Sequence, residues 1–554
     1  MKFRIILLAV LAGTTFLSAC TPKGEPRDES GSSPNIIVLF SDELQFEDIG
    51  FCGGNIPTPN IDALAAEGLY FENAYTPAPM CTPSRYALLS GRFPGRCSDP
   101  DFLEDYPITE PYCIGWNTYL DRSVMTLPRL LSANGYITGM VGKWHVSSGK
   151  QVKAGLKGED SPKDDAVNEK LAVHQQLASA KVKEDAGFDV AKSVMFGNFD
   201  GFPVKALRVH NFPWFNKGAL DFIEAGAKGD KPFFLYLAAT SIHGPHHGEG
   251  LVRDYSFTPE GKLEGIDAYN LDVEKLAAEI ESKSSPESHR YTGMAFLDHQ
   301  VGSIMDKLKE LGIDENTIVI FLPDHNTEPG KASCYEKGIK IPMIIKWPGK
   351  IDAASRTSAL VQSIDIMPTI MEIVGAELPE GYKIDGQSIL PVIENNELPH
   401  KQYIFSESGF TRSVSDGTFK YIAFRYPERL VKDMKDGKLD KAPTQLDKSA
   451  AFPLINMTYY PSYWDADQLF DLSTDPYEQD NLAVDPLYAE KLASLKGVLQ
   501  EHLDTFDHAF DLSPCGFMDS EQYRTLVEAS SQGKLEDIFW FERDWGTISW
   551  PPVE

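Results

Sequence analysis

Basic residues are scarce in this chain of 554 residues, which has 52 Lys and Arg against 81 Asp and Glu. The net charge of −29, with histidine neutral, argues against duplex nucleic acid as a partner, because binding to phosphates requires clustered cations. An anionic substrate would depend on a local basic pocket rather than on long-range attraction. Hydrophobic residues make up 42% of the chain, enough for a large buried core, which excludes a wholly disordered or fibrous protein.

Cysteine is also rare, with seven residues in the whole chain. Neither their number nor their spacing is typical of a small disulfide-stabilised scaffold. Cys97 and Cys113 bracket one loop-like insertion, and whether they pair stays open at this point.

The N-terminal apolar run is too short to cross a membrane. Lys2 and Arg4 precede Ile5–Leu17, whereas a transmembrane helix needs about 20 apolar residues. The pattern predicts a signal peptide over residues 1–19. Its end, Leu-Ser-Ala-Cys, resembles a bacterial lipoprotein box in which Cys20 is lipidated; an ordinary signal peptide cut nearby is the alternative. We therefore expect an exported cell-envelope lipoprotein, at the outer membrane, in the periplasm or on the cell surface, that touches the membrane only through a lipid anchor.

Four short apolar runs organise the larger part of the chain. Continuous runs of this kind are typical of strands that are buried on both faces. They are Asn35–Phe40, Ile137–Val141, Phe233–Leu237 and Thr317–Leu322. Helical patterns lie between them, at Thr58–Gly68, Thr126–Gly135 and Met294–Leu308. The alternation predicts an α/β fold with a large doubly wound mixed sheet flanked by helices on both sides.

The pattern changes after residue 395. Short strand-like runs predict a smaller C-terminal α+β domain with an antiparallel sheet, followed by a helix near Tyr488–Phe506 and an aromatic tail. The strand-like runs are Tyr403–Phe405, Arg412–Val414 and Lys420–Phe424, and the tail contains Phe539, Trp540, Phe541, Trp545 and Trp550. The predicted organisation is a tether over residues 20–33, a catalytic domain over 34–395 and the smaller domain over 396–554.

Ionisable residues follow each of the four apolar runs. They are Asp42 and Glu43, Lys143 and His145, His243, and Asp324 and His325. Ligands of open α/β sheets bind beyond the carboxyl ends of the strands, so these side chains are expected in one polar cleft.

Asp42, Glu43, Asp324 and His325 are the candidate ligands of one divalent cation. Paired carboxylates favour hard cations such as Ca²⁺ or Mg²⁺, and Ca²⁺ is the ion we expect. The imidazole of His325 would suit Mn²⁺ or Zn²⁺ better than an oxygen ligand would.

The segment from Cys81 to Arg92 has the pattern of a short helix. Thr82 suits the N-cap, Pro83 the first helical position and Gly91 the end. Cys81 would therefore lie at a helix N-terminus, where backbone N–H groups favour negative charge, and Arg85 could face the same side.

The order Cys-Thr-Pro-Ser-Arg, followed by Ser-Gly, resembles the signature of the type I sulfatases of the alkaline phosphatase superfamily. Further segments are similar to other motifs of that family, so the resemblance covers residues 34 to about 482 with gaps. They are Pro34–Leu39 with Asp42, Gly135–Thr138, Gly142–His145, Lys331–Gly338, Ile341–Gly349 and Asp471–Leu482. Glu43 and His325 depart from the commonest pattern, which has Asp and often Asn at these positions.

The resemblance implies hydrolysis of sulfate monoesters. It implies that a formylglycine-generating enzyme oxidises Cys81 to Cα-formylglycine (3-oxoalanine), whose hydrate is the nucleophile and also a metal ligand. Arg85 and Lys143 would hold the hydrate, and His145 would hydrogen-bond its hydroxyl. His243 and Lys331 would bind the sulfate, with His243 protonating the leaving alcohol.

A sulfated oligo- or polysaccharide is the expected substrate. The segments Ser98–Asp121 and His210–Asn216 and the aromatic tail are candidates for the sugar subsites. Two other functions stay open: a phosphonate monoester or phosphodiester hydrolase of the same superfamily, and a surface glycan-binding lipoprotein that catalyses nothing.

Overall fold

The computed structural model describes ten stretches of the chain. They are residues 33–106, 108–109, 112–148, 152, 154–244, 253–269, 287–327, 329–425, 456 and 459–513. The predicted signal peptide, the lipidation site Cys20 and the aromatic tail lie outside the described residues, as does the tether except for its last residue. In the part of the chain that is described, no helix is both long and apolar enough to cross a bilayer.

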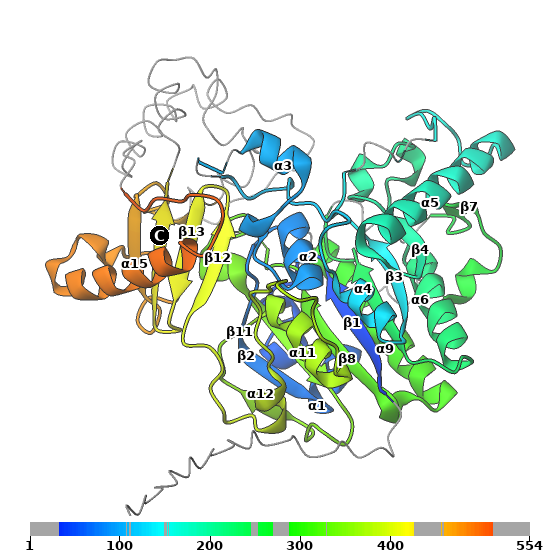
Figure 1. Ribbon diagram of the computed structural model, residues 1–554. Coiled ribbons are helices and arrows are strands. Elements are labelled where there is room, and N and C mark those ends of the chain that lie inside the picture. The colour runs from blue at the N-terminus through cyan, green and yellow to red at the C-terminus, as the bar shows by residue number, and fades with distance from the viewer. Residues whose placement is uncertain are drawn as a thin grey trace, which may run out of the picture.

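A large mixed sheet forms the centre of the molecule (Figure 1). Its strand order is β10-β2-β9-β8-β1-β5-β3-β4, with β11 also paired to β2. The four predicted strands are its central neighbours and run parallel: β8 (Thr317–Pro323), β1 (Asn35–Ser41), β5 (Phe233–Ala239) and β3 (Ile137–Lys143). The remaining strands are β2 (Leu69–Tyr75), β4 (Val190–Met195), β9 (Lys340–Lys346), β10 (Ser355–Thr357) and β11 (Val361–Gln362). Because β9 is antiparallel to both β8 and β2, the sheet is mixed, as predicted.

Helices cover both faces of this sheet. Alternate side chains of β1 belong to two separate buried clusters: Val38 lies in one and Leu39 in the other. On the Val38 face lie α2 (Cys81–Ser90), α4 (Leu127–Ala133) and α11 (Ile366–Val374) (Figure 1). On the Leu39 face lie α1 (Pro59–Ala66), α6 (Phe212–Ala227) and α9 (Glu287–Leu311). The long helix α5 (Asp165–Ala186) packs against β4 at the edge of the sheet.

Some of the predicted helix ends are confirmed by the structure and one is wrong. The Thr126 hydroxyl caps α4 by accepting a hydrogen bond from the Arg129 N–H at 3.4 Å, and Gly91 ends α2 with φ of 65°. The prediction that Thr82 caps α2 is wrong, because the helix already begins at Cys81 and the Thr82 hydroxyl is buried inside it with no partner in the described structure. Cys81 itself lies at the helix N-terminus, as expected.

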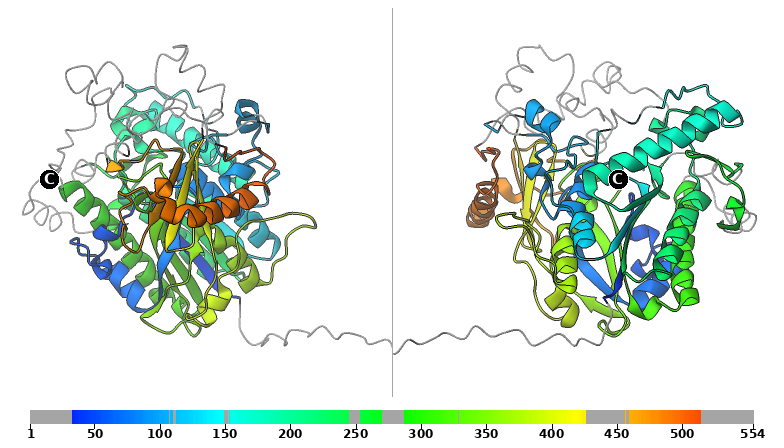
Figure 2. Two further views of the ribbon diagram at one scale, coloured as in Figure 1. Left: turned by 90° about the vertical axis from the view of Figure 1, so that its left-hand side faces the viewer. Right: turned by 45° about the vertical axis from the view of Figure 1, so that its right-hand side comes forward.

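A second, antiparallel sheet lies beside the first. Its order is β12-β13-β14-β15, and Figure 2 shows α15 (Ala489–Leu503) lying across it. The strands β12 (Ile404–Ser408), β13 (Thr411–Ser415) and β14 (Phe419–Phe424) match the three predicted runs, whereas β15 (Asp467–Asp471) was not predicted. Leu495 and Leu499 of α15 belong to the same buried cluster as Val38, so the core continues between the two sheets. Short elements complete the described structure: α3 (Pro100–Asp105), α10 (Glu336–Ile339), α12 (Leu390–Glu394), β6 (Phe257–Thr258) and β7 (Gly261–Lys262).

Candidate active site

The carboxyl ends of the four central strands carry a cluster of charged side chains. Asp42 follows β1, Asp324 follows β8, Lys143 is the last residue of β3, and His243 lies four residues beyond β5. Because these strands are parallel neighbours, the side chains gather at one edge of the sheet, as the sequence predicts.

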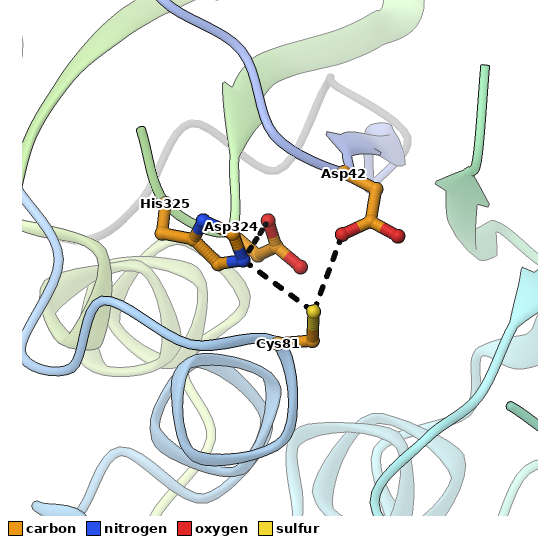
Figure 3. Close-up of side chains that lie close together, drawn as sticks. All are labelled: Asp42, Cys81, Asp324 and His325. Atoms are coloured by element: carbon orange, nitrogen blue, oxygen red, sulfur yellow. Dashed lines mark hydrogen bonds and ion pairs between the residues drawn. The ribbon is translucent and has the colours of Figure 1, made fainter. Parts of the chain in front are cut away.

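Cys81 points from the start of α2 toward this edge (Figure 3). Its Sγ lies 3.4 Å from Asp42 Oδ1 and 3.4 Å from His325 Nε2, and the residue is 1% exposed. Burial and the nearby Asp42 raise the pKa of the Cys81 thiol far above its usual value. This environment disfavours the thiolate of an unmodified Cys81, which is its nucleophilic form.

Four side chains have the geometry of a metal site. One ligand atom from each of Asp42, Cys81, Asp324 and His325 lies within 4.8 Å of all the others, and all four residues are buried. Two ligands that are each about 2.4 Å from one Ca²⁺ are at most about 4.8 Å apart, so the spacing fits a single bound cation.

Two buried cations neutralise the two carboxylates. Lys143 Nζ donates to Asp42 Oδ2 at 2.5 Å, and Arg85 donates to Asp324 Oδ2 at 2.8 Å. Burial would raise the pKa of Asp42, but Lys143 and its other cationic neighbours hold that pKa well below the usual value. Burial and the proximity of Asp42 instead raise the pKa of Asp324.

Backbone conformation places Lys143 and His145. Gly142 has φ of 103°, and a Cβ there would lie 2.1 Å from the carbonyl oxygen of Ala238 on β5, so only glycine fits. His145 also has a positive φ, of 58°, and its buried Nδ1 has no hydrogen-bond partner in the described structure. Burial and the adjacent Lys143 lower its pKa well below the usual value, so the ring is neutral and can accept a hydrogen bond.

Glu43 does not join the four clustered side chains. Its backbone has φ of 58°, and its carboxylate forms an ion pair with Lys331 and lies 3.5 Å from His243 Nε2. The Glu43 N–H donates to Asp324 Oδ1 at 3.2 Å. A direct metal contact by Glu43 stays a prediction.

Lys331 and His243 form the outer side of the site. Burial lowers the pKa of Lys331 to about 8, and this residue is 3% exposed. The His243 ring lies 3.5 Å from the Asn198 side chain, and its backbone carbonyl contacts His210 Nε2 at 2.9 Å. A buried cation next to an imidazole is suited to holding an anion beside the clustered carboxylates.

Three partners of the site were not predicted from the sequence. Tyr236 Oη lies 3.4 Å from Arg85, and the Ser84 hydroxyl donates to the Asp324 backbone carbonyl at 2.6 Å. The third is Asn198, next to His243. Ser84 lies inside the Cys-Thr-Pro-Ser-Arg signature and could have been found there, whereas Tyr236 is one residue of an apolar run and Asn198 carries no sequence signal.

Of the segments proposed for sugar subsites, His210–Asn216 is buried, whereas Ser98–Asp121 is buried only in part. Phe102 and Tyr112 pack on each other, and the Tyr112 hydroxyl donates to Glu407 of β12 at 3.0 Å. Trp214 is also buried, at the start of α6. Cys97 and Cys113 form no disulfide with each other.

The geometry combines a buried cation site with several positive groups that face Cys81. Such a site can neutralise both an attacking oxygen anion and an anionic ester, which is what hydrolysis of a charged monoester requires.

Comparison with known proteins identifies relatives over most of the chain. A family model described as "Sulfatase" matches residues 34–376, and one described as "N-sulphoglucosamine sulphohydrolase, C-terminal" matches residues 330–505. Arylsulfatase A of Homo sapiens is 28% identical, with 86% of each chain covered. The N-acetylgalactosamine-6-O-sulfatase of Bacteroides thetaiotaomicron is 24% identical over 86% of this chain and 95% of its own.

Solved structures share the fold. The crystal structure of Ps i-CgsB with k-i-k-neocarrahexaose has a TM-score of 0.57 at 20% identity, covering 91% of this chain and 99% of that one. A protein solved with its substrate D-glucosamine-2-N,6-O-disulfate has a TM-score of 0.56 at 18% identity, covering 86% of this chain and 98% of that one. At these identities the likeness is one of fold alone.

Proposed function

This chain belongs to the sulfatase family and is a sulfuric ester hydrolase; from this premise we propose that it removes sulfate from a sulfated saccharide with a formylglycine nucleophile at Cys81. The observation that carries the proposal is the position of Cys81, buried at the start of α2 within reach of Asp42 and His325. The family match favours an enzyme over a non-catalytic glycan-binding lipoprotein.

The proposed nucleophile is the hydrate of an oxidised Cys81. Burial and Asp42 disfavour the thiolate of an unmodified Cys81, whereas a geminal diol offers two hydroxyl groups. One hydroxyl attacks the sulfur and the alcohol departs, leaving a sulfated side chain. The second hydroxyl then expels sulfate as the aldehyde forms again. A serine would lack this exit and would stall as the ester.

The surrounding residues have separate proposed roles. Lys143 and Arg85 hold the nucleophile through the charges that they place beside Cys81, and neutral His145 accepts a hydrogen bond from its hydroxyl. Lys331 binds the sulfate, and His243 binds it and protonates the departing alcohol. The burial of Arg85, Lys143 and Lys331 excludes water from these cations and strengthens their electrostatic contacts.

We propose Ca²⁺ as the bound ion, with Mg²⁺ or Mn²⁺ as alternatives. Asp42, Asp324, His325 and the converted Cys81 would hold it, and Glu43 remains a further candidate ligand. When bound, a divalent cation supplies positive charge that lowers the pKa of a nearby hydroxyl and stabilises a sulfate oxygen.

The substrate proposal is supported by the names of the relatives. They include an N-acetylgalactosamine-6-O-sulfatase and, from Formosa agariphila, an ulvan-active sulfatase that is 25% identical over 90% of this chain. Export through the predicted signal peptide, a lipid on Cys20 and conversion by a formylglycine-generating enzyme belong to the same proposal and would place the enzyme at the cell envelope.

The test is desulfation of a panel of defined saccharides by protein whose Cys81 peptide has been weighed by mass spectrometry. The panel contains N-acetylgalactosamine 6-sulfate, glucosamine 2-N,6-O-disulfate, and carrageenan and ulvan oligosaccharides, with an aryl sulfate and an aryl phosphonate alongside. We expect sulfate release from at least one saccharide, at a higher kcat/KM than phosphonate hydrolysis. Faster phosphonate hydrolysis, or no release from any saccharide by converted protein, would contradict the saccharide assignment.

A further inference from the structure

A pocket of about 490 Å³, its open mouth included, lies at the same edge of the main sheet as the active site. Its walls come from the loop after β1, the loop after β8, the start of β9 and the segment that follows β15. None of the side chains assigned to the reaction lines it.

Residues that line the pocket are direct neighbours of active-site residues, in the sequence and through a backbone hydrogen bond. Asn326 lines the pocket and directly follows His325. Thr327 is another wall residue, and its carbonyl accepts a hydrogen bond from the Lys331 N–H at 3.2 Å. The pocket therefore borders the sulfate-binding side of the site.

Tyr477 supplies the pocket with an aromatic ring, and Lys337 supplies it with a positive charge. The Tyr477 side chain lines the pocket and is 58% exposed, although large aromatic side chains are usually buried. Lys337 Nζ lies 6.0 Å from the centre of the Tyr477 ring and 5.9 Å from that of Tyr459. An aromatic face beside a cation suits a flat apolar sugar face that carries a negatively charged substituent.

The charge of Lys337 is available to a ligand. Among the described residues, Lys337 Nζ forms an ion pair with Glu47 at 3.8 Å, and the Glu47 side chain is 64% exposed. Exposed pairs of this kind contribute little, so an anionic ligand can replace Glu47 at small cost. The other acidic wall residue, Glu336, is held by buried Lys420 at 2.7 Å and does not compete for Lys337.

We propose that this pocket is a saccharide subsite: it holds a sugar next to the one that is desulfated, with the ring against Tyr477 and an anionic substituent at Lys337. This inference rests on the proposed function, because it assumes a saccharide longer than one sugar. In a chain with a net charge of −29, a local cation of this kind would select anionic oligosaccharides from the surroundings.

The experiment compares two substrates in four variants. The substrates are 4-methylumbelliferyl sulfate, which is too small to span both sites, and the oligosaccharide of the panel that wild-type protein hydrolyses fastest. The variants are Lys337→Ala, Tyr477→Ala, Tyr477→Phe and, as a control, Lys350→Ala, an exposed lysine at the opposite end of β9. The measured quantity is the ratio of the two kcat/KM values.

We expect the ratio of oligosaccharide to aryl sulfate activity to fall at least tenfold in Lys337→Ala and Tyr477→Ala, mainly through KM. Tyr477→Phe keeps the ring and should keep the ratio, as should Lys350→Ala. An active wild-type enzyme whose ratio is unchanged in both alanine variants would overturn the subsite. A wild-type protein that hydrolyses no oligosaccharide would instead overturn the proposed function, and the subsite with it.

Repeating the comparison with an oligosaccharide that lacks any second anionic group separates the two contacts. The Lys337→Ala effect should then disappear while the Tyr477→Ala effect persists. Loss of both effects would show that ring stacking plays no part, and persistence of both would show that Lys337 does not act through charge.

Discussion

Replacing Arg85 by methionine tests the charge balance of the active site. Arg85 is fully buried, donates to Asp324 Oδ2 at 2.8 Å and to the Lys143 carbonyl at 3.1 Å, and lies 3.7 Å from Asp42 Oδ1. Methionine keeps much of the aliphatic volume and removes the charge. Asp324 would then be a buried carboxylate without its main cation.

The expected cost follows from this loss. Removing one partner of a buried ion pair costs about 3–5 kcal/mol, because the other charge stays buried. At about 2.1 cal/mol/K per residue, unfolding a chain of this length has an entropy near 1.2 kcal/mol/K, so Tm should fall by about 3–4 °C. A divalent cation on Asp42 and Asp324 would replace part of the missing charge, so added Ca²⁺ should reduce the loss.

The assay is thermal unfolding of wild-type protein and Arg85→Met, each with EDTA and with Ca²⁺. Arg356→Met is the matched control, since the Arg356–Glu72 pair is exposed at 3.5 Å and should contribute less than about 0.5 kcal/mol. A Tm drop in Arg85→Met no larger than in the control would refute the charge argument. An equal drop with and without Ca²⁺ would refute the placement of the cation on these carboxylates.

Three further predictions concern the nucleophile, the backbone and pH. Cys81→Ser should lose at least about 10³-fold in turnover while its free energy of unfolding changes by less than about 1 kcal/mol; wild-type rates would contradict the nucleophile. Gly142→Ala should lower Tm much more than Gly135→Ala, because both glycines have positive φ but only Gly142 meets a backbone oxygen, and equal shifts would contradict the steric argument. Burial raises the pKa of Glu478 from 4.5 to about 7, although Lys420 opposes this shift. The folded state therefore holds a proton that the unfolded state releases between about pH 4.5 and 7, so stability falls as pH rises through this window. Glu478→Gln should reduce that slope in a Tm–pH series, and an unchanged slope would show that another group is responsible.

The sequence predicted the four central parallel strands of the main sheet but missed β2 and β9. The runs that became β1, β3, β5 and β8 are continuously apolar because both faces of these strands are buried. β2 was missed because Glu72 and Asn73 interrupt its apolar run, and β9 because Pro342 argues against a central strand. In the structure, Pro342 lies opposite the irregularity between Phe71 and Ala74 of β2, where the regular ladder is broken.

The meeting of Asp42 and Asp324 was also predictable, because parallel neighbouring strands bring distant residues to one edge. Cys81 lies on α2, and its place beside them was implied only by the resemblance of its segment to the sulfatase signature. The direction of Glu43 was not, since it depends on a left-handed backbone conformation that a non-glycine residue does not signal. The pocket at Tyr477 was not predictable from the sequence either, because four separate segments form it.

The central claim is that an oxidised Cys81 within a buried divalent-cation site hydrolyses sulfate esters. The most direct measurement is the rate of sulfate release from one substrate at saturating Ca²⁺, across preparations whose converted fraction of Cys81 is determined by mass spectrometry. The rate should be proportional to the converted fraction and should extrapolate to zero for unconverted protein. Equal rates in converted and unconverted preparations would contradict it.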